Sequence, residues 1–163
     1  MILADTDILS AMAKIARLPL LFSLFQTTEI HIAPGVFSEL EHSFNLGRDY
    51  AQDIFALLAS GKIRMVYLTQ TEVAFRDTLP AALGAGERES IALGKSRAGV
   101  ILSNESRVAH CCRHHAVTCL RLPDILRALW AEKIVTKHEV QVVIGDLRVK
   151  DRMQFKQETI EHF

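Results

Sequence analysis

The chain has 163 residues, a length that fits one compact domain. Hydrophobic residues make up 49% of it, enough for a sizeable core, and charged residues make up 23%. The formal net charge is +0, which argues against a protein that coats nucleic acid by bulk electrostatic attraction. One local basic patch remains compatible with this balance.

The three cysteines all lie between positions 111 and 119, unlike the framework of a secreted disulfide-rich domain. A reducing compartment therefore suits the chain. The N-terminus carries Asp5 and Asp7 where a signal peptide would carry basic residues. No apolar run reaches membrane-spanning length, and the stretch from Leu18 to Phe25 is short and contains a proline. We therefore expect a cytoplasmic protein with no membrane partner.

Short apolar runs alternate with helical periodicity in the first part of the chain. The expected elements are, in order, a strand at Ile2–Ala4, helical segments interrupted at Pro19, a strand at Glu29–Ala33, a helix from Pro34 and a helix at Asp49–Ser60. Pro34 suits a first helical turn, where no N–H is needed. In the helix that follows it, Val36, Leu40 and Phe44 recur at spacing four, which predicts one buried stripe.

The same alternation continues beyond Gly61. The expected elements are a strand at Ile63–Leu68, an irregular stretch at Thr69–Gly86, a helix at Glu87–Arg97, a strand at Gly99–Leu102, a helix at Arg107–His115 and a strand at Ala116–Leu120. The irregular stretch holds Pro80 and two glycines. Strands that alternate with helices predict an α/β fold with a parallel sheet and right-handed crossovers.

From Pro123 onward the sequence has helical periodicity. We expect Trp130, Leu126 and Leu129 to pack a helix onto the domain, and we expect Val140–Ile144 to be helical although it is rich in β-branched residues. A basic segment follows, with Arg148, Lys150, Arg152 and Lys156. It is read either as a solvated helix end or as an RNA contact.

Oxygen-bearing side chains gather near the ends of the expected strands. They are Asp5 and Asp7 after the first strand, Glu39 in the helix after the second, Glu87 and Glu89 at a helix start before the fourth, and Ser103, Asn104 and Glu105 after the fourth. Ligands of open parallel sheets bind beyond the carboxyl ends of the strands. Because Mg²⁺ and Mn²⁺ prefer oxygen ligands, this grouping predicts a divalent-metal site able to activate water at a phosphodiester.

Each acid also has a purely structural interpretation. Asp5 and Asp7 are suited to capping a helix, and Glu87 and Glu89 favour a helix dipole from the first turn. Glu39 fits a solvated helix face. Taken singly these interpretations are the simpler ones, and only the shared edge of the sheet favours a metal site.

Four segments carry a family resemblance. They are ILADTDIL with Asp5, APGVFSEL with Glu39, GAGERESIAL with Glu89 and Glu87, and VILSNESRVA with Asn104. Together they resemble the motifs of the PIN-domain family, including the VapC-type toxins. The third segment is the most specific. The resemblance covers residues 1–122, taken as the nuclease domain, and leaves residues 123–163 as a helical extension packed on the same domain.

The resemblance implies a three-layer α/β/α sandwich with a central parallel sheet, followed by C-terminal helices. It also implies an endoribonuclease that cleaves single-stranded RNA with Mg²⁺ or Mn²⁺. Many relatives pair with a small antitoxin and many dimerise, so RNA, a small antitoxin and a second copy of the chain are the expected partners.

The resemblance also assigns roles to residues. Asp5, Glu39 and Glu89 would hold the metal, and Asn104 would complete the catalytic set by orienting a water. The supporting residues around them would be Thr6, Asp7, Ser103, Glu87 and Glu105, and the candidate RNA contacts are Arg88, Lys95 and Arg107.

The fourth segment departs from the family pattern. Many relatives carry two aspartates where this chain has Asn104 and Glu105. Asn104 offers a carbonyl oxygen without a charge, which predicts weaker metal affinity. A non-catalytic alternative is therefore kept, namely a PIN-fold module that binds RNA or protein.

Other interpretations fit less well. Asp5-Thr6-Asp7 mimics the D-x-D of haloacid-dehalogenase-type phosphatases, but the paired aspartates after a later strand are missing. A response-regulator receiver needs an aspartate after the third strand, where Thr69 and Gln70 stand. A zinc site is conceivable from the His/Cys cluster His110, Cys111, Cys112, His114, His115 and Cys119. Buried free cysteines on a helix are the simpler interpretation of that cluster.

Overall fold

A computed structural model describes residues 1–155 of the chain. It contains one five-stranded sheet in the order β3-β2-β1-β4-β5 with every pairing parallel. The strands are β1 Ile2–Ala4, β2 Ile30–Ile32, β3 Ile63–Met65, β4 Val100–Leu102 and β5 Thr118–Leu120. The five predicted strands are therefore confirmed, most of them one or two residues shorter than expected.

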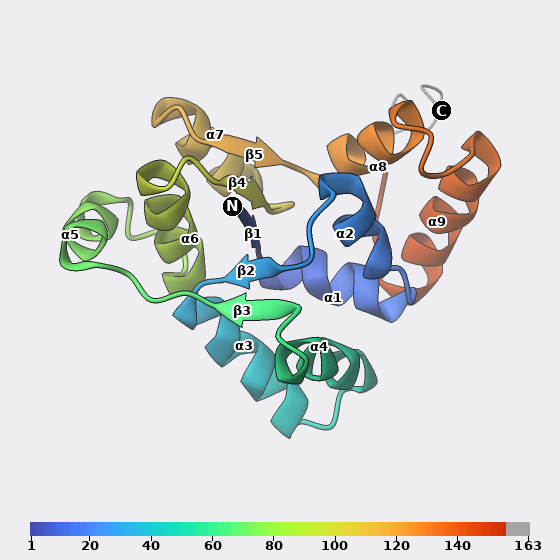
Figure 1. Cartoon of the computed structure of the whole chain (residues 1–163), viewed down its shortest axis with the longest axis horizontal. Coiled ribbons are helices and arrows are strands. Elements are labelled where there is room, and N and C mark those ends of the chain that lie inside the picture. Colours follow the sequence, from blue (N-terminus) through green and yellow to red (C-terminus); the bar gives the residue numbers. More distant parts are fainter. Residues whose placement is uncertain (156–163) are drawn as a thin grey trace.

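Helices cover both faces of this sheet, which confirms the predicted three-layer α/β/α sandwich (Figure 1). They are α1 Thr6–Lys14, α2 Pro19–Phe25, α3 Pro34–Asn45, α4 Asp49–Ala59, α5 Gln70–Thr78, α6 Ala85–Ser96, α7 Ser106–His114, α8 Leu122–Ala131 and α9 Lys137–Lys150. Helix α4 packs on α1 and α3, whereas α6 packs on α5 and α7. The helix predicted across Val140–Ile144 is confirmed as part of α9.

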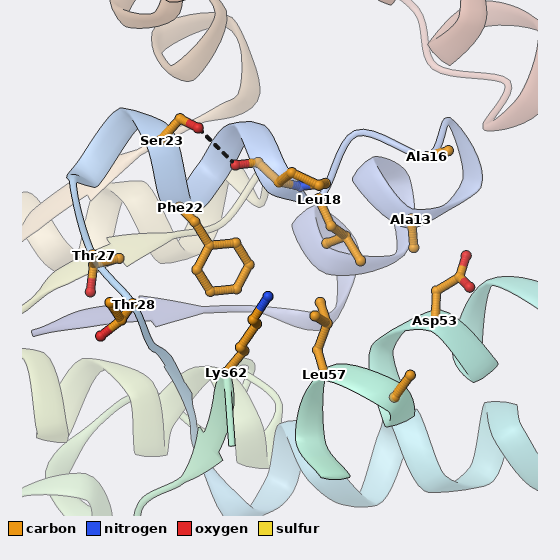
Figure 2. A pocket seen from close by; sticks show the side chains of 12 residues that line it. Ala13, Ala16, Leu18, Phe22, Ser23, Thr27, Thr28, Asp53, Leu57 and Lys62 are labelled. Carbon is orange, nitrogen blue, oxygen red and sulfur yellow. Dashed lines mark hydrogen bonds between the residues drawn. The ribbon is translucent and has the colours of Figure 1, made fainter. Parts of the chain in front are cut away.

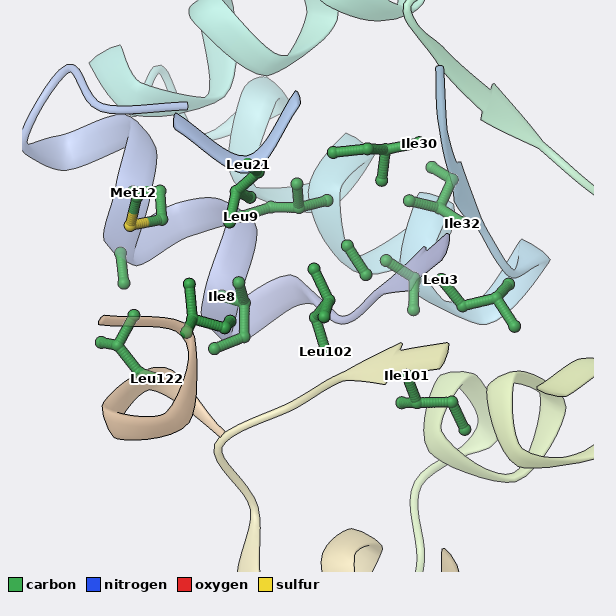
Figure 3. Packing of buried hydrophobic residues seen from close by; sticks show 14 of the residues in the cluster. Leu3, Ile8, Leu9, Met12, Leu21, Ile30, Ile32, Ile101, Leu102 and Leu122 are labelled. Carbon is green, nitrogen blue, oxygen red and sulfur yellow. The ribbon is translucent and has the colours of Figure 1, made fainter. Parts of the chain in front are cut away.

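The central strand β1 lies between β2 and β4, so its side chains are buried on both faces. Leu3 is fully buried, and α1 packs Ile8, Leu9 and Met12 into the same core (Figure 3). Burial of this kind contributes about 1.5–3 kcal/mol per large apolar side chain. The residue that follows β1 is therefore fixed in position by a rigid core.

The C-terminal helices pack against the N-terminal ones, α8 on α2 and α9 on α1. Lys14 and Asp151 form an ion pair that joins α1 to the end of α9. Leu126 and Leu129 are fully buried as expected, but Trp130 is 41% exposed. The two leucines therefore pack α8 onto the domain as predicted, and the Trp130 side chain is covered only in part. The domain boundary at residue 122 stays a prediction.

The irregular stretch expected at Thr69–Gly86 is wrong, because it contains helix α5. Thr69 and Glu72 form a reciprocal capping box, with Thr69 N donating to Glu72 Oε2 at 2.7 Å. Arg97 then donates two hydrogen bonds to the Glu72 carboxylate, at 2.7 and 2.8 Å. These bonds hold the pKa of the buried Glu72 well below its usual value, at about 2, and tie α5 to the end of α6.

Two smaller expectations also fail. Phe44 does not join the buried stripe of α3, since it is 42% exposed and stacks on Phe55 of α4 at the domain surface. Helix α6 begins at Ala85, two residues before the predicted start. Within residues 1–155, no single helix is long and apolar enough to cross a membrane, and α1 with α2 reaches that length only as a pair bent by 120°.

Candidate active site at the carboxyl edge of the sheet

Asp5 stands at the centre of the candidate site, directly after β1, and is 7% exposed. Its Oδ1 accepts a hydrogen bond from Thr6 N at 2.8 Å, so it caps α1 as the structural interpretation requires. Its Oδ2 accepts from Ser103 Oγ at 2.9 Å, across the sheet from the end of β4. Asp5 can therefore cap α1 and belong to the candidate site at the same time.

Asp7 was predicted to support the site, and its carboxylate directly contacts the turn after β4. Its Oδ1 accepts from Ile8 N at 2.7 Å and its Oδ2 from Asn104 N at 2.8 Å. The second bond ties the start of α1 to the turn after β4. Residues of the fourth segment therefore hydrogen-bond both carboxylates of the first segment, Ser103 to Asp5 and Asn104 to Asp7.

Burial, and after it the neighbouring charge of Asp7, raise the pKa of Asp5 to about 7. Burial, together with repulsion from Glu105 and Glu87, raises the pKa of Asp7 to about 6. Hydrogen bonds to both groups act in the opposite direction but do not compensate for burial. The site therefore concentrates negative charge in a place where water solvates it poorly.

Glu39 reaches this edge from the first turns of α3. Thr6 Oγ1 donates to Glu39 Oε2 at 2.6 Å, which links the first and second motifs. Glu39 also raises the pKa of Asp5 through its charge, so the two carboxylates are neighbours. The structure thereby brings Asp5, Asp7 and Glu39 together.

Glu89 is held at the other side of the α3 N-terminus. Its Oε2 accepts from Gly35 N at 2.6 Å, and its Oε1 lies 3.8 Å from Arg76. Sequence reasoning missed Arg76 because it missed α5, and the Thr69–Glu72 capping box was the signal that could have revealed that helix.

Two glycines allow the helices that carry Glu39 and Glu89 to approach each other. A Cβ atom on Gly35 would lie 2.5 Å from Gly86 N, and one on Gly86 would lie 2.9 Å from Val36 N. No side chain fits at either position without moving α3 away from α6. The glycines of the second and third motifs are therefore explained by packing.

Two further acids, Glu87 and Glu105, lie near Asp7 at this edge of the sheet. Glu87 Oε2 accepts from Gly84 N at 2.6 Å and caps α6, while its charge still acts on Asp7. Glu105 is exposed after β4 and also acts on Asp7. Within residues 1–155, the Asn104 side-chain oxygen is buried and accepts no hydrogen bond. The backbone N–H of the same residue donates to Asp7, so Asn104 adjoins the acids of the site.

The predicted RNA contacts fall in three different places. Arg107 donates to Ala82 O at 3.1 Å, near the start of α6, and Arg88 lies in the first turns of α6. Lys95 stacks over the Phe75 ring at 4.7 Å, six residues beyond Glu89. At 1.5 Å per residue this is about 9 Å along the helix, away from the acidic edge.

The donor set fits a hard divalent cation. It consists of carboxylate oxygens and one amide oxygen, and Asp5 and Asp7 are carboxyl groups whose charge the protein alone stabilises poorly. In the part of the chain that the structure describes, no three His, Cys, Asp or Glu side chains form a ready-made metal site. The residues that would hold the ion therefore have to adjust on binding.

Most of the His/Cys cluster lies on α7, and its Cys119 reaches this edge from β5. Cys111 and Cys112 are buried on α7, and Cys119 on β5 lies within 4.0 Å of Ser103 O. His114 and His115 stack edge to face on each other, and His115 stacks on Phe75. These side chains pack α7 against its neighbours.

A further cavity lies away from the acids of the site. Its volume is about 640 Å³, and it lies at the amino ends of β2 and β3, where Thr28 and Lys62 line it. Figure 2 shows Lys62 reaching into it between Phe22 and Leu57. Cavity size therefore does not mark the candidate site here.

A five-stranded parallel sheet with acids collected beyond the ends of β1 and β4 defines a nuclease-like α/β protein. A family model described as a PIN domain matches residues 1–163, so the chain belongs to the PIN-domain family. PIN domains are generally nucleases and typically use divalent metals.

The chain also resembles solved structures. One of them is a domain of a functionally unknown protein from Methanocaldococcus jannaschii DSM 2661, at 16% identity and a TM-score of 0.46, covering 74% of this chain and 89% of that one. No curated protein shows significant similarity to the chain.

The glycine contact yields a stability prediction. Gly86→Ala places a methyl group against Val36 and should lower the free energy of unfolding by about 1–3 kcal/mol. Gly145→Ala is the matched control, because a Cβ atom there meets nothing within 4 Å and helix propensity should raise stability by about 0.5–1 kcal/mol. Urea unfolding measures both, and equal effects of the two substitutions would contradict the packing argument.

The burial of Asp5 yields a pH prediction. Its pKa is near 7 in the folded protein and 3.8 in the unfolded chain, so the folded state binds the proton more tightly. Its contribution to stability is complete below about pH 4 and is lost as the pH rises through 7. In EDTA at pH 8, Asp5→Asn should therefore be more stable than the wild type by about 1–3 kcal/mol.

Urea unfolding at pH 4 and pH 8 measures this difference, which should vanish at the lower pH. Asp53→Asn, at an exposed position on α4, serves as the control. A destabilised Asp5→Asn protein at pH 8 would show that the hydrogen bonds to Asp5 outweigh its repulsion and burial.

Proposed function

We propose that this PIN-domain protein is a divalent-metal-dependent endoribonuclease that cleaves single-stranded RNA with Mg²⁺ or Mn²⁺. The observation that carries the proposal is the pair of buried carboxyl groups, Asp5 and Asp7, whose pKa values are raised to about 7 and about 6. Buried acids of this kind are characteristic of functional sites, and a bound cation would stabilise their charged form. Family membership supports a nuclease over other hydrolases.

Asp5, Glu39 and Glu89 would hold the ion, and Asp7 lies close enough to Asp5 to join them. A bound divalent ion supplies Lewis acidity and lowers the pKa of a coordinated water. The chain's own residues orient the carboxylates. Thr6 and Ser103 donate to Glu39 and Asp5, and Gly35 donates to Glu89. The lone Asn104 oxygen would accept a hydrogen bond from a water or a ribose hydroxyl.

RNA cleavage tests the proposal with a matched pair of variants on α3. Purified protein is incubated with labelled single-stranded RNA and Mn²⁺ or Mg²⁺, with EDTA as the control. Glu39→Gln should lower the cleavage rate at least about 100-fold, because it removes a carboxylate from the site. Glu41→Gln, exposed two residues further along the same helix, should leave the rate unchanged.

Asp5→Asn should also abolish cleavage, and single-stranded DNA should be cleaved more slowly than RNA. Cleavage that persists in EDTA, or equal loss in Glu39→Gln and Glu41→Gln, would overturn the metal-dependent mechanism.

A second candidate function is a PIN-fold module that binds RNA or protein with little catalysis. The observation that favours it is Asn104, whose neutral side chain stands where a charged ligand would strengthen the site. Loss of that charge lowers the attraction for a cation without disturbing the fold.

Asn104→Asp should then raise the affinity for Mn²⁺ about tenfold and increase cleavage, because it adds a carboxylate to a site built for oxygen ligands. Calorimetric titration of both proteins measures the affinity. Ser106→Asp, an exposed position at the start of α7, controls for nonspecific charge. Unchanged affinity in Asn104→Asp would remove Asn104 as the reason for a weakened site.

The proposal extends to partners and location. We infer a toxin paired with a small antitoxin, and a homodimer, because Trp130, Val142 and Val149 on α8 and α9 are exposed apolar side chains suited to a partner surface. A short neighbouring reading frame for a DNA-binding protein would support the toxin role. The three free cysteines suit a cytoplasmic protein.

A further inference from the structure

A polar cavity of about 310 Å³ is lined by Asn104, whose backbone N–H donates to Asp7. Two arginines line it, Arg121 directly after β5 and Arg127 on α8. Because Arg121 follows a parallel strand, it lies at the same edge of the sheet as Asp5. The cavity therefore adjoins the candidate active site through Asn104.

A second cavity, of about 460 Å³, borders the same part of the chain. Arg148 and Arg152 line it, and residues 153–155 line both cavities. The two hollows thus form one track, with Asn104 at one end, Arg121 and Arg127 next, and Arg148 and Arg152 beyond. We call this the arginine track.

The charge of the arginine track is largely available to a ligand. Arg127 lies 3.2 Å from the Asp124 carboxylate, but both side chains are more than 40% exposed, so the pair is weak. Within residues 1–155, the side chains of Arg121, Arg148 and Arg152 form no ion pair. Asp151, which directly precedes Arg152, is paired with Lys14.

The lining also suits the other parts of a nucleotide. Met153 and Phe155 are partly buried against the core and present apolar surface to the cavity. Single-stranded nucleic acids bind where cationic grooves follow the backbone and aromatic rings offer a stacking face. Guanidinium groups match phosphate oxygens through paired hydrogen bonds.

We propose that the arginine track binds the backbone of single-stranded RNA next to the bond to be cleaved, with Arg121 and Arg127 nearest the acidic edge. This inference rests on the proposed function and assigns it a substrate-binding surface. A protein of zero net charge needs such a local surface, because the acids of the site repel phosphate on their own.

The test measures binding without cleavage. Full-length wild-type protein in EDTA is titrated against a fluorescein-labelled single-stranded RNA, and anisotropy is followed from low to moderate salt. Arg121→Gln/Arg127→Gln should raise Kd about tenfold and lower the salt slope by about 1.4, at about 0.7 per lost phosphate contact. Arg148→Gln/Arg152→Gln should show a smaller loss of the same kind.

Arg113→Gln is the matched control. Arg113 is exposed at the end of α7, which runs from the carboxyl end of β4 back to the start of β5, so it lies near the opposite edge of the sheet. This variant should bind RNA like the wild type. Urea unfolding of each variant verifies that the fold is intact.

The outcomes separate the two proposals. Binding that depends on Arg121 and Arg127 without any metal-dependent cleavage would support the arginine track and overturn the nuclease function. Metal-dependent cleavage with unchanged binding in Arg121→Gln/Arg127→Gln would overturn the arginine track alone. Equal weakening by Arg113→Gln would reduce the effect to overall charge and would also overturn it.

Discussion

The burial of Asp5 at the end of the central strand is the constraint on which the site depends. Strand β1 is paired on both sides, and Asp5 N donates to Leu102 O at 2.9 Å, so the backbone cannot turn the carboxylate toward solvent. A carboxylate in such a place is costly unless it gains partners. Two hydrogen bonds reduce the cost, yet the pKa of Asp5 still reaches about 7. Under the proposed metal-dependent function, stability and function would therefore oppose each other at this residue.

The second constraint is how closely α3 and α6 approach. Glu39 and Glu89 lie on different helices, and neither is adjacent to Asp5 in sequence. Gly35 and Gly86 remove the side chains that would separate these helices, and the freed Gly35 N–H holds Glu89 directly. Arg76 offsets part of the Glu89 charge at 3.8 Å, which limits the repulsion that several acids would otherwise create. Packing and electrostatics thus act together.

Much of the fold was predictable because its signals are local. Five short apolar runs alternate with helices, and parallel pairing follows from that alternation. The failures have equally physical causes. Pro80 and two glycines suggested an irregular stretch, yet the Thr69 capping box and the Arg97–Glu72 bonds stabilise α5. Phe44 is exposed although its spacing matched the stripe, because periodicity alone does not show where a helix extends past the core.

The structure brings Asp5 and Glu39 together, whereas Glu89 contacts Gly35 and Arg76. Which residues form the site therefore stays a prediction that rests on the motifs. They did not reveal that Asp7 bonds to Asn104 N, since that contact joins residues 97 positions apart. Arg76 and Arg121 were missed for a related reason. A single basic residue has no sequence signal of its own, and its role depends on which acid or cavity the tertiary fold places beside it.

The distribution of charge connects these observations. A net charge of zero argued against bulk electrostatic attraction to nucleic acid but left room for one local basic patch. The structure instead separates the charges, with Asp5 and Asp7 beyond β1 and, within residues 1–155, with Arg121, Arg148 and Arg152 outside any ion pair. Under the proposed function, this separation would attract a polyanion to the arginine track and a cation to the neighbouring acids, although the net charge is zero. A metal-dependent nuclease requires both attractions at neighbouring positions. Asn104 donates its backbone N–H to Asp7 and also lines the first cavity of the arginine track, so it lies between the acids and the arginines.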